Sequence, residues 1–147
     1  QQSLFSTSFY LWLKEFMTEN EYCRERLIFE INETALLKDV ELATKHINLF
    51  KTLGISICIE RFGTSFTSFK YLRGLDLDFI KLDGSYIKDL INHTENNYYI
   101  QAVNQVCHSL GIKVIACHIE SDEILNQIKE LECDACQGQF IQIPTEL

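Results

Sequence analysis

Short apolar runs alternate with longer amphipathic segments along nearly the whole chain. In residues 39–54, apolar side chains recur at the three- and four-residue spacing of a helix face, and the segment ends at Gly54. The runs between such segments are short and rich in isoleucine, leucine and phenylalanine, which is typical of buried strands. The pattern predicts strands at residues 26–31, 55–59, 77–82 and 112–116, and a final strand within residues 133–141. It predicts helices at residues 8–20, 39–54, 65–75, 85–91, 96–111 and 121–131.

This alternation of strands and helices indicates an α/β fold with a parallel sheet and right-handed crossovers. Two architectures fit it: an open, doubly wound sheet, or part of a (β/α)8 barrel. A complete barrel needs about 250 residues, whereas this chain has 147 residues and five predicted strands. Either the sheet is open, or the other strands of a barrel lie outside the chain. In both cases residues 1–147 are expected to be part of a single domain.

The chain is acidic, with a formal net charge of −8. A general nucleic-acid-binding protein needs a basic face that neutralises phosphates, so no nucleic acid is expected as a partner. A small anionic ligand is still compatible with this charge, because one or two local cations and backbone amides are enough to hold it.

Six cysteines are present. Several of them, such as Cys58 and Cys107, lie within apolar runs, where a thiol behaves as a small buried side chain. We therefore expect free thiols in a reducing compartment. The sequence has no signal-peptide pattern and no apolar stretch long enough to cross a membrane, so the chain is expected to be soluble. It does not begin with Met, which indicates a fragment, and membrane segments of a parent protein would lie outside it.

Polar or charged residues follow every predicted strand. Functional groups of parallel α/β folds lie at the carboxyl ends of the strands, so these positions are candidates for a site. Any one of them is explained equally well as a solvated residue where a strand meets a loop, but five strand ends in succession indicate a site. The candidates are Glu30, Asn32, Glu33, Glu60, Arg61, Lys81, Asp83, Cys117, His118, Glu120, Gln137 and Gly138.

Four stretches of the chain resemble the successive strand-end motifs of EAL domains, the phosphodiesterase domains of bacterial cyclic di-GMP signalling. They read LIFEINET, ICIERFGTSFTSFKYLRGLDLDFIKLDGSYI, GIKVIACHIES and DACQGQFIQIP. The family pattern runs E-I-T-E, D-D-F-G-T-G, K-I-D-R-S-F, A-E-G-V-E and Q-G-Y. The resemblance extends from about Gln2 to Pro144. It implies a TIM-type (β/α)8 barrel of which this chain covers about the last five β/α units, with the Glu-Ala-Leu signature before Gln1.

Active members of the family hydrolyse one phosphodiester bond with two divalent cations, which need several converging carboxylates. Glu30 retains its acid, and Glu60 replaces the first aspartate of D-D-F-G. Arg61 replaces the second aspartate, which changes the charge by two units and costs several kcal/mol near a cation at about 4 Å. Cys117 replaces the glutamate of A-E-G-V-E, and a thiol is a poor ligand for Mg²⁺. We therefore predict no metal and no catalytic residue, with Glu30, Glu60 and Lys81 as remnants of the family's site.

The resemblance implies that the positions contacting the nucleotide are better kept than the metal positions. Without metals, Lys81 becomes a cation for a phosphate oxygen, and Gln137 offers both a donor and an acceptor. The predicted ligand-binding residues are Glu30, Arg61, Phe62, Gly63, Lys81, Asp83, Glu120, Gln137 and Gly138.

The sequence thus leads to the hypothesis of a degenerate EAL domain that binds cyclic di-GMP without hydrolysing it. It is most similar to receptors of the LapD type. That similarity implies a cytoplasmic domain of an inner-membrane receptor, with other domains such as a degenerate GGDEF domain and with a dimer as the assembly.

Three alternatives remain open at the level of the sequence. The first is an active phosphodiesterase with Mg²⁺ or Mn²⁺, in which Glu60 bridges the metals and Arg61 turns away. The second is a protein-interaction module that binds no nucleotide. The third is a zinc site formed by Cys133, Cys136, Cys117 and His118, for which a single C-x-x-C pair is weak support. Alternation along a strand would also direct Cys133 and Cys136 to opposite faces.

Overall fold

The five strands form one parallel sheet in which strand order follows chain order, β1-β2-β3-β4-β5. The computed structural model describes residues 6–23, 26–65 and 68–142. The strands are β1 (Ile28–Asn32), β2 (Ser56–Phe62), β3 (Phe79–Leu82), β4 (Lys113–Ala116) and β5 (Ala135–Cys136). The helices are α1 (Thr7–Glu19), α2 (Glu33–Leu36), α3 (Val40–Thr52), α4 (Gly84–Lys88), α5 (Thr94–Ser109) and α6 (Asp122–Glu130), with 3-10 turns η1 (Glu21–Cys23) and η2 (Phe69–Gly74).

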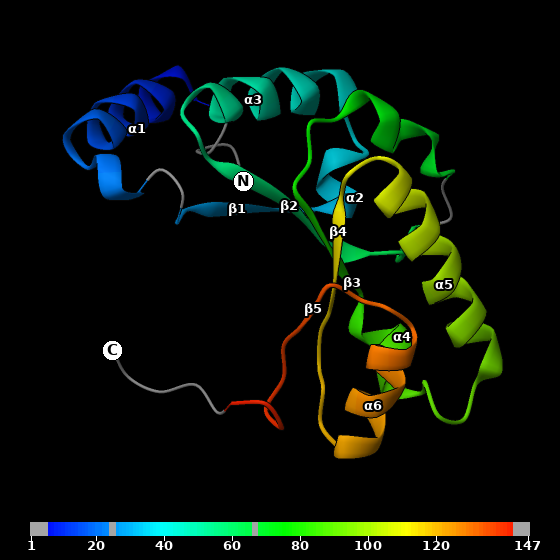
Figure 1. The fold of residues 1–147 in the computed structure, drawn as a ribbon. Helices are drawn as coiled ribbons and strands as arrows, with labels where there is room; N and C mark the ends of the chain where they lie inside the picture. The colour runs from blue at the N-terminus through cyan, green and yellow to red at the C-terminus, as the bar shows by residue number, and fades with distance from the viewer. Residues whose placement is uncertain (1–5, 24–25, 66–67, 143–147) are drawn as a thin grey trace.

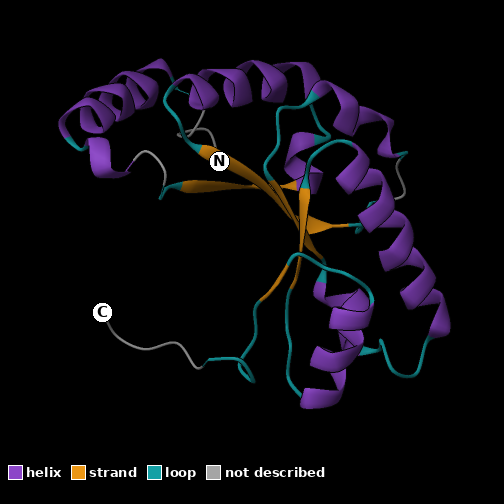
Figure 2. Cartoon of the chain, viewed as in Figure 1, coloured by secondary structure: helices purple, strands orange, loops and turns teal. Residues whose placement is uncertain are grey.

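The sequential strand order decides between the two architectures that the sequence left open. A doubly wound sheet reverses its strand order at a switch point, so that helices cover both faces. Here every step goes to the next strand, and right-handed crossovers then place the helices on one side only. The long helices α1, α3 and α5 form an outer arc with the strands inside it (Figure 1 and Figure 2). This is the arrangement of a barrel wall.

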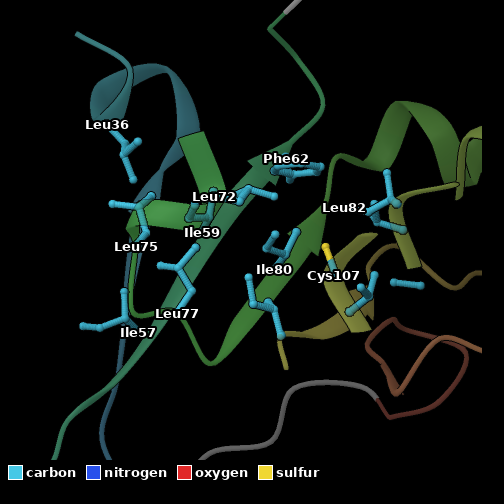
Figure 3. Packing of buried hydrophobic residues seen from close by; sticks show 14 of the residues in the cluster. Leu36, Ile57, Ile59, Phe62, Leu72, Leu75, Leu77, Ile80, Leu82 and Cys107 are labelled. Carbon is cyan, nitrogen blue, oxygen red and sulfur yellow. The ribbon is translucent and has the colours of Figure 1, made fainter. Parts of the chain in front are cut away.

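Side chains alternate along the strands between the helix layer and the opposite face, as a period of two requires. On β2 and β3, Ile57, Ile59, Ile80 and Leu82 are buried against the helices. Figure 3 shows these four side chains together with Leu72, Leu75 and Leu77 of the segment that joins the two strands. The opposite face of the same strands carries the polar candidates, so the core and the site share one sheet.

Two predicted elements differ from the structure. The strand expected at residues 133–141 is limited to β5, because the chain turns after Gly138, whose carbonyl accepts from the N–H groups of Ile141 and Gln142. The helix expected at residues 65–75 is the 3-10 turn η2, which Ser68 caps at Lys70 N–H. Residues 66–67 of that prediction lie outside the described residues. No helix in the described ranges is long and apolar enough to cross a membrane.

The same contact repeats at the amino ends of two strands. Asp78, just before β3, accepts from Ile57 N–H at 2.8 Å and from Lys51 Nζ. Asp134, just before β5, accepts from Val114 N–H at 2.7 Å, and its Oδ2 lies 2.8 Å from His108 Nε2. Each aspartate therefore joins the start of one strand to the last turn of a helix, at the end of the sheet opposite the candidate site.

The Asp134 contact predicts an acid-dependent loss of stability. Burial opposes ionisation of this carboxyl, but the hydrogen bonds from Val114 N–H and from His108 outweigh it and lower the pKa of Asp134. A depressed pKa stabilises the folded state above the ordinary aspartate value of about 3.9, and this contribution is lost as the pH falls through the folded pKa. Between about pH 4 and pH 2, we expect the unfolding free energy of Asp134→Asn to decrease less than that of the wild type, as measured by urea denaturation. The exposed Asp89→Asn is the matched control, and parallel curves for wild type and Asp134→Asn would contradict the prediction.

Candidate functional site

A pocket of about 740 Å³ lies at the carboxyl ends of the strands. This size is within the range of roughly 300–1,000 Å³ that is typical of small-molecule sites. Among the predicted ligand-binding residues, the pocket brings together Glu30, Arg61, Lys81, Asp83, Glu120, Gln137 and Gly138. Glu60, Cys117 and His118 line it as well. The structure thus gathers polar groups from all five strand ends, while their contact with a ligand stays a prediction.

A β-bulge in β2 brings two consecutive residues, Glu60 and Arg61, into this pocket. Ile59 pairs with Ile80 and Phe62 pairs with Leu82, so β2 has one residue more than β3 over the same length. Arg61 has φ +55°, in the left-handed region. Regular alternation would direct neighbouring side chains to opposite faces. The bulge removes this restriction, as bulges next to active sites often do.

The bulge also explains why two of the predicted ligand-binding residues lie elsewhere. Without the extra residue, Phe62 would face the pocket side. With it, Phe62 points into the helix layer and is 1% exposed. Its ring stacks on that of Phe69, with 5.8 Å between the ring centroids. Gly63 has φ +96° and no room for a Cβ, which would lie 2.3 Å from the Tyr99 hydroxyl oxygen. Neither residue lines the pocket, so the structure assigns Phe62 to the core and Gly63 to the loop after β2.

Lys81 of β3 and Glu30 of β1 form an ion pair across the pocket wall, with Lys81 Nζ donating to Glu30 Oε1. Their side chains are 19% and 39% exposed, so the pair is only partly screened by water. Burial alone would lower the pKa of the Lys81 ammonium, but the hydrogen bond and charge of Glu30 outweigh it and raise that pKa. Lys81 is therefore a stable cation at neutral pH.

Arg61 pairs with Asp83, which follows β3. Arg61 Nε lies 3.5 Å from Asp83 Oδ2, while Oδ1 of the same carboxylate accepts from Ser85 N–H at 3.0 Å and caps α4. Burial opposes ionisation of Asp83, but the Ser85 hydrogen bonds and the Arg61 guanidinium lower its pKa. The positive charge that the sequence places at position 61 is thus bound to an acid of the same pocket.

Cys117, at the end of β4, is a protonated thiol in this setting. Burial raises the pKa of Cys117, and the nearby Glu30, Asp83 and Glu60 carboxylates raise it further against the opposite effect of Lys81. Burial likewise raises the pKa of Cys58, which faces the pocket side of β2, to about 12. Both thiols are therefore protonated at neutral pH.

Gly138 and Gln137 hold the edge of the pocket beside β4. A Cβ at position 138 would lie 2.2 Å from the Ile119 carbonyl oxygen, so only glycine permits this approach of the two backbones. Gln137 N–H donates to Ala116 O, and Ile119 N–H donates to Gln137 O. This ladder continues beyond β5 and sets Glu120 and Gln137 on the same wall.

The most buried acid of the strand ends is Glu33, which the sequence placed among the strand-end candidates but not among the predicted ligand-binding residues. Its side chain is 1% exposed and does not line the pocket. One carboxylate oxygen accepts from Gly63 N–H at 3.1 Å and Ser65 N–H at 3.4 Å, and the other accepts from the Tyr71 hydroxyl at 2.7 Å. Glu33 therefore fixes the loop that follows Arg61. The sequence offered one signal for Glu33: it lies two residues after a predicted strand.

The residues present do not fit a pair of divalent metal ions. Three of the four positions that the resemblance marks for metal binding are unsuited to it: Glu30 is bound by Lys81, position 61 is cationic, and position 117 offers a thiol in place of a carboxylate. Among the described residues, no group of three or more His, Cys, Asp or Glu is arranged to hold a metal ion. This applies to the zinc alternative as well, because Cys133, Cys136, Cys117 and His118 all lie among the described residues.

The sheet order and the pocket define the class: part of a parallel β/α barrel with its site at the carboxyl ends of the strands. The chain belongs to the EAL domain family, because a sequence model of that family matches residues 1–144. It is 34% identical over 137 residues to cyclic di-GMP phosphodiesterase PdeA of Borreliella burgdorferi, covering 92% of this chain and 20% of PdeA. It is 33% identical over 125 residues to cyclic di-GMP phosphodiesterase PdeF of Escherichia coli, covering 83% of this chain and 16% of PdeF.

Solved structures agree with this assignment. The FimX EAL domain from Pseudomonas aeruginosa bound to cyclic di-GMP superposes with a TM-score of 0.90 at 27% identity, over 98% of this chain and 59% of that one. An EAL domain protein from Listeria monocytogenes superposes with a TM-score of 0.83 at 29% identity, over 97% of this chain and 57% of that one. The predicted TIM-type barrel is thereby confirmed as the fold class. The chain spans about a fifth of PdeA and about three fifths of the FimX domain.

The contacts of Glu33 predict a large effect of its removal. Glu33→Ala leaves two backbone N–H groups and the Tyr71 hydroxyl without their acceptor. We expect the free energy of unfolding to fall by about 2–4 kcal/mol, and Tyr71→Phe, which removes one hydrogen bond, to cost about 1 kcal/mol. Urea denaturation measures both, and hydrogen exchange at Gly63 should accelerate. The exposed Glu41→Ala serves as control; equal losses in Glu33→Ala and Glu41→Ala would contradict the assignment.

Proposed function

We propose that this domain is a receptor for cyclic di-GMP that binds the messenger without hydrolysing it. The observation that carries the proposal is the pairing of charges in the pocket: Lys81 holds Glu30, and Arg61 holds Asp83. Two acids that could attract divalent cations are bound by protein cations. No metal cofactor is proposed; Mg²⁺ or Mn²⁺ belongs only to the alternative of an active enzyme.

The ligand chemistry fits the same groups. Cyclic di-GMP carries two negatively charged phosphodiesters, and the pocket offers Arg61, Lys81 and Lys88 as cations. The pair of Arg61 and Asp83 is weak, because the Arg61 side chain is 68% exposed and its Nε lies 3.5 Å from Asp83 Oδ2. Arg61 can therefore exchange Asp83 for a phosphate at little cost. Gln137 adds an amide that donates and accepts. The FimX structure, at 27% identity, contains cyclic di-GMP, which supports this ligand.

The second candidate is an active cyclic di-GMP phosphodiesterase. The names of PdeA and PdeF favour it, since both are phosphodiesterases at more than 30% identity. Against it stand the cation at position 61 and the thiol at position 117, which the chemistry of hard divalent ions does not accommodate.

The proposal extends to the rest of the protein. PdeA is several times longer than the matched region, as expected if EAL domains work beside other domains. We propose that this domain lies in the cytoplasm as part of a longer inner-membrane receptor. Other domains, such as a degenerate GGDEF domain, and a dimeric assembly would then carry the signal.

Binding without turnover is the direct test. We expect the longest natural chain containing residues 1–147 to bind cyclic di-GMP with a dissociation constant on the order of 10 μM or tighter in calorimetry. Chromatography after incubation with Mg²⁺ or Mn²⁺ should show no linear pGpG. Lys81→Ala should weaken binding at least about tenfold, because it removes a phosphate cation. Accumulation of pGpG would establish the enzyme instead, and absence of binding would favour the interaction module.

Restoring the two acids should restore a metal-dependent reaction. In Arg61→Asp with Cys117→Glu, the pocket regains the carboxylates of the family pattern beside Glu30 and Glu60. We expect Mn²⁺-dependent hydrolysis at least about tenfold above the wild type, since charged oxygens attract hard cations. The control is Arg61→Asn with Cys117→Gln, which has similar shape without the charges. Equal rates in the two double variants would show that these positions do not limit turnover.

A further inference from the structure

His118 is the one aromatic side chain at the pocket wall among the described residues, and its backbone is unusual. It follows β4 with φ +61°, a left-handed conformation that non-glycine residues rarely adopt. Its side chain is exposed and makes no hydrogen bond within the described part of the chain. The backbone conformation alone does not identify a role, because histidine is among the non-glycine residues enriched in it. The position of the ring in the pocket is what needs an explanation.

The imidazole packs against Gly84, the first residue of α4. A Cβ at position 84 would lie 2.3 Å from His118 Cδ2 and 2.9 Å from Nε2, so the ring occupies the space that any other residue at position 84 would need. Both positions depart from the family pattern, which has arginine in K-I-D-R and glycine in A-E-G-V-E. The two departures touch each other: the glycine at position 84 leaves room for the imidazole at position 118.

We propose that His118 is a ligand-binding residue of this pocket, whose ring N–H donates to a phosphodiester oxygen of the bound cyclic dinucleotide. An imidazole retains at least one N–H donor in both protonation states, so the contact does not depend on a charge. Asp83 Oδ1 accepts from Ser85 N–H, and no hydrogen bond joins Asp83 to His118 among the described residues, which leaves the histidine donor available for an anion. This inference rests on the proposed function and adds to it a residue that the family pattern does not supply.

Replacing the ring tests this role in the longest natural chain that contains residues 1–147. His118→Gly removes the donor and relieves the left-handed backbone. We expect cyclic di-GMP affinity to fall about tenfold in calorimetry, while the melting temperature is no lower than in the wild type. His118→Asn tolerates the same backbone and keeps an N–H donor, so it should lose less affinity than His118→Gly. A purely structural role would lower the melting temperature and leave affinity unchanged.

The outcomes separate this inference from the proposed function. If the wild type binds and His118→Gly binds equally well, the role of His118 is overturned and the receptor stands. If the wild type does not bind cyclic di-GMP, both are overturned.

The contact with Gly84 gives a second, independent test. Gly84→Ala should displace the ring and weaken binding by about the same factor in the wild type, but have no further effect in His118→Gly. Gly74→Ala is the matched control, since a Cβ there would meet nothing within 4 Å. Equal losses from Gly84→Ala in both backgrounds would contradict the coupling.

Discussion

The ion pair between Lys81 and Glu30 is the interaction on which the pocket depends. It joins the carboxyl ends of β3 and β1 across the intervening strand β2, where both side chains are only partly exposed. Removing one member would leave the other charge half-buried without a partner, which is costly. The pair therefore does two things: it keeps a lysine charged where a phosphate can reach it, and it keeps an acid from attracting a divalent ion. The pairing of Arg61 with Asp83 repeats this arrangement on the neighbouring wall.

Backbone geometry then determines which side chains enter the pocket. The bulge in β2 places Glu60 and Arg61 on the same side and turns Phe62 into the core. Two of the three non-glycine residues with a left-handed backbone in the described ranges, Arg61 and His118, line the pocket. Local preferences are often broken at functional sites, because the surrounding fold compensates for the strain. Below the pocket, the alternating isoleucines and leucines of β2 and β3 supply that compensation.

The order of strands and helices could be predicted from the sequence, because buried runs and amphipathic segments have different periods. The residues at the strand ends that form the pocket could be predicted from the same pattern, because parallel strands bring their carboxyl ends to one edge. The bulge could not be predicted, because it depends on the register between β2 and β3, and Phe62 was misplaced for that reason. The loop contacts of Glu33 and the packing of His118 on Gly84 depend on segments far apart in the sequence, so periodicity carries no signal for them. The short β5 reflects a turn after Gly138, which ends the strand before the apolar Phe140 and Ile141.

The central claim is that protein cations have taken the place of metal ions in this pocket. Electron paramagnetic resonance of Mn²⁺ added to the wild-type protein, with cyclic di-GMP present, counts the bound ions directly. The account predicts that the signal of free Mn²⁺ remains essentially undiminished at stoichiometric concentrations. Two ions bound per chain under these conditions would contradict it.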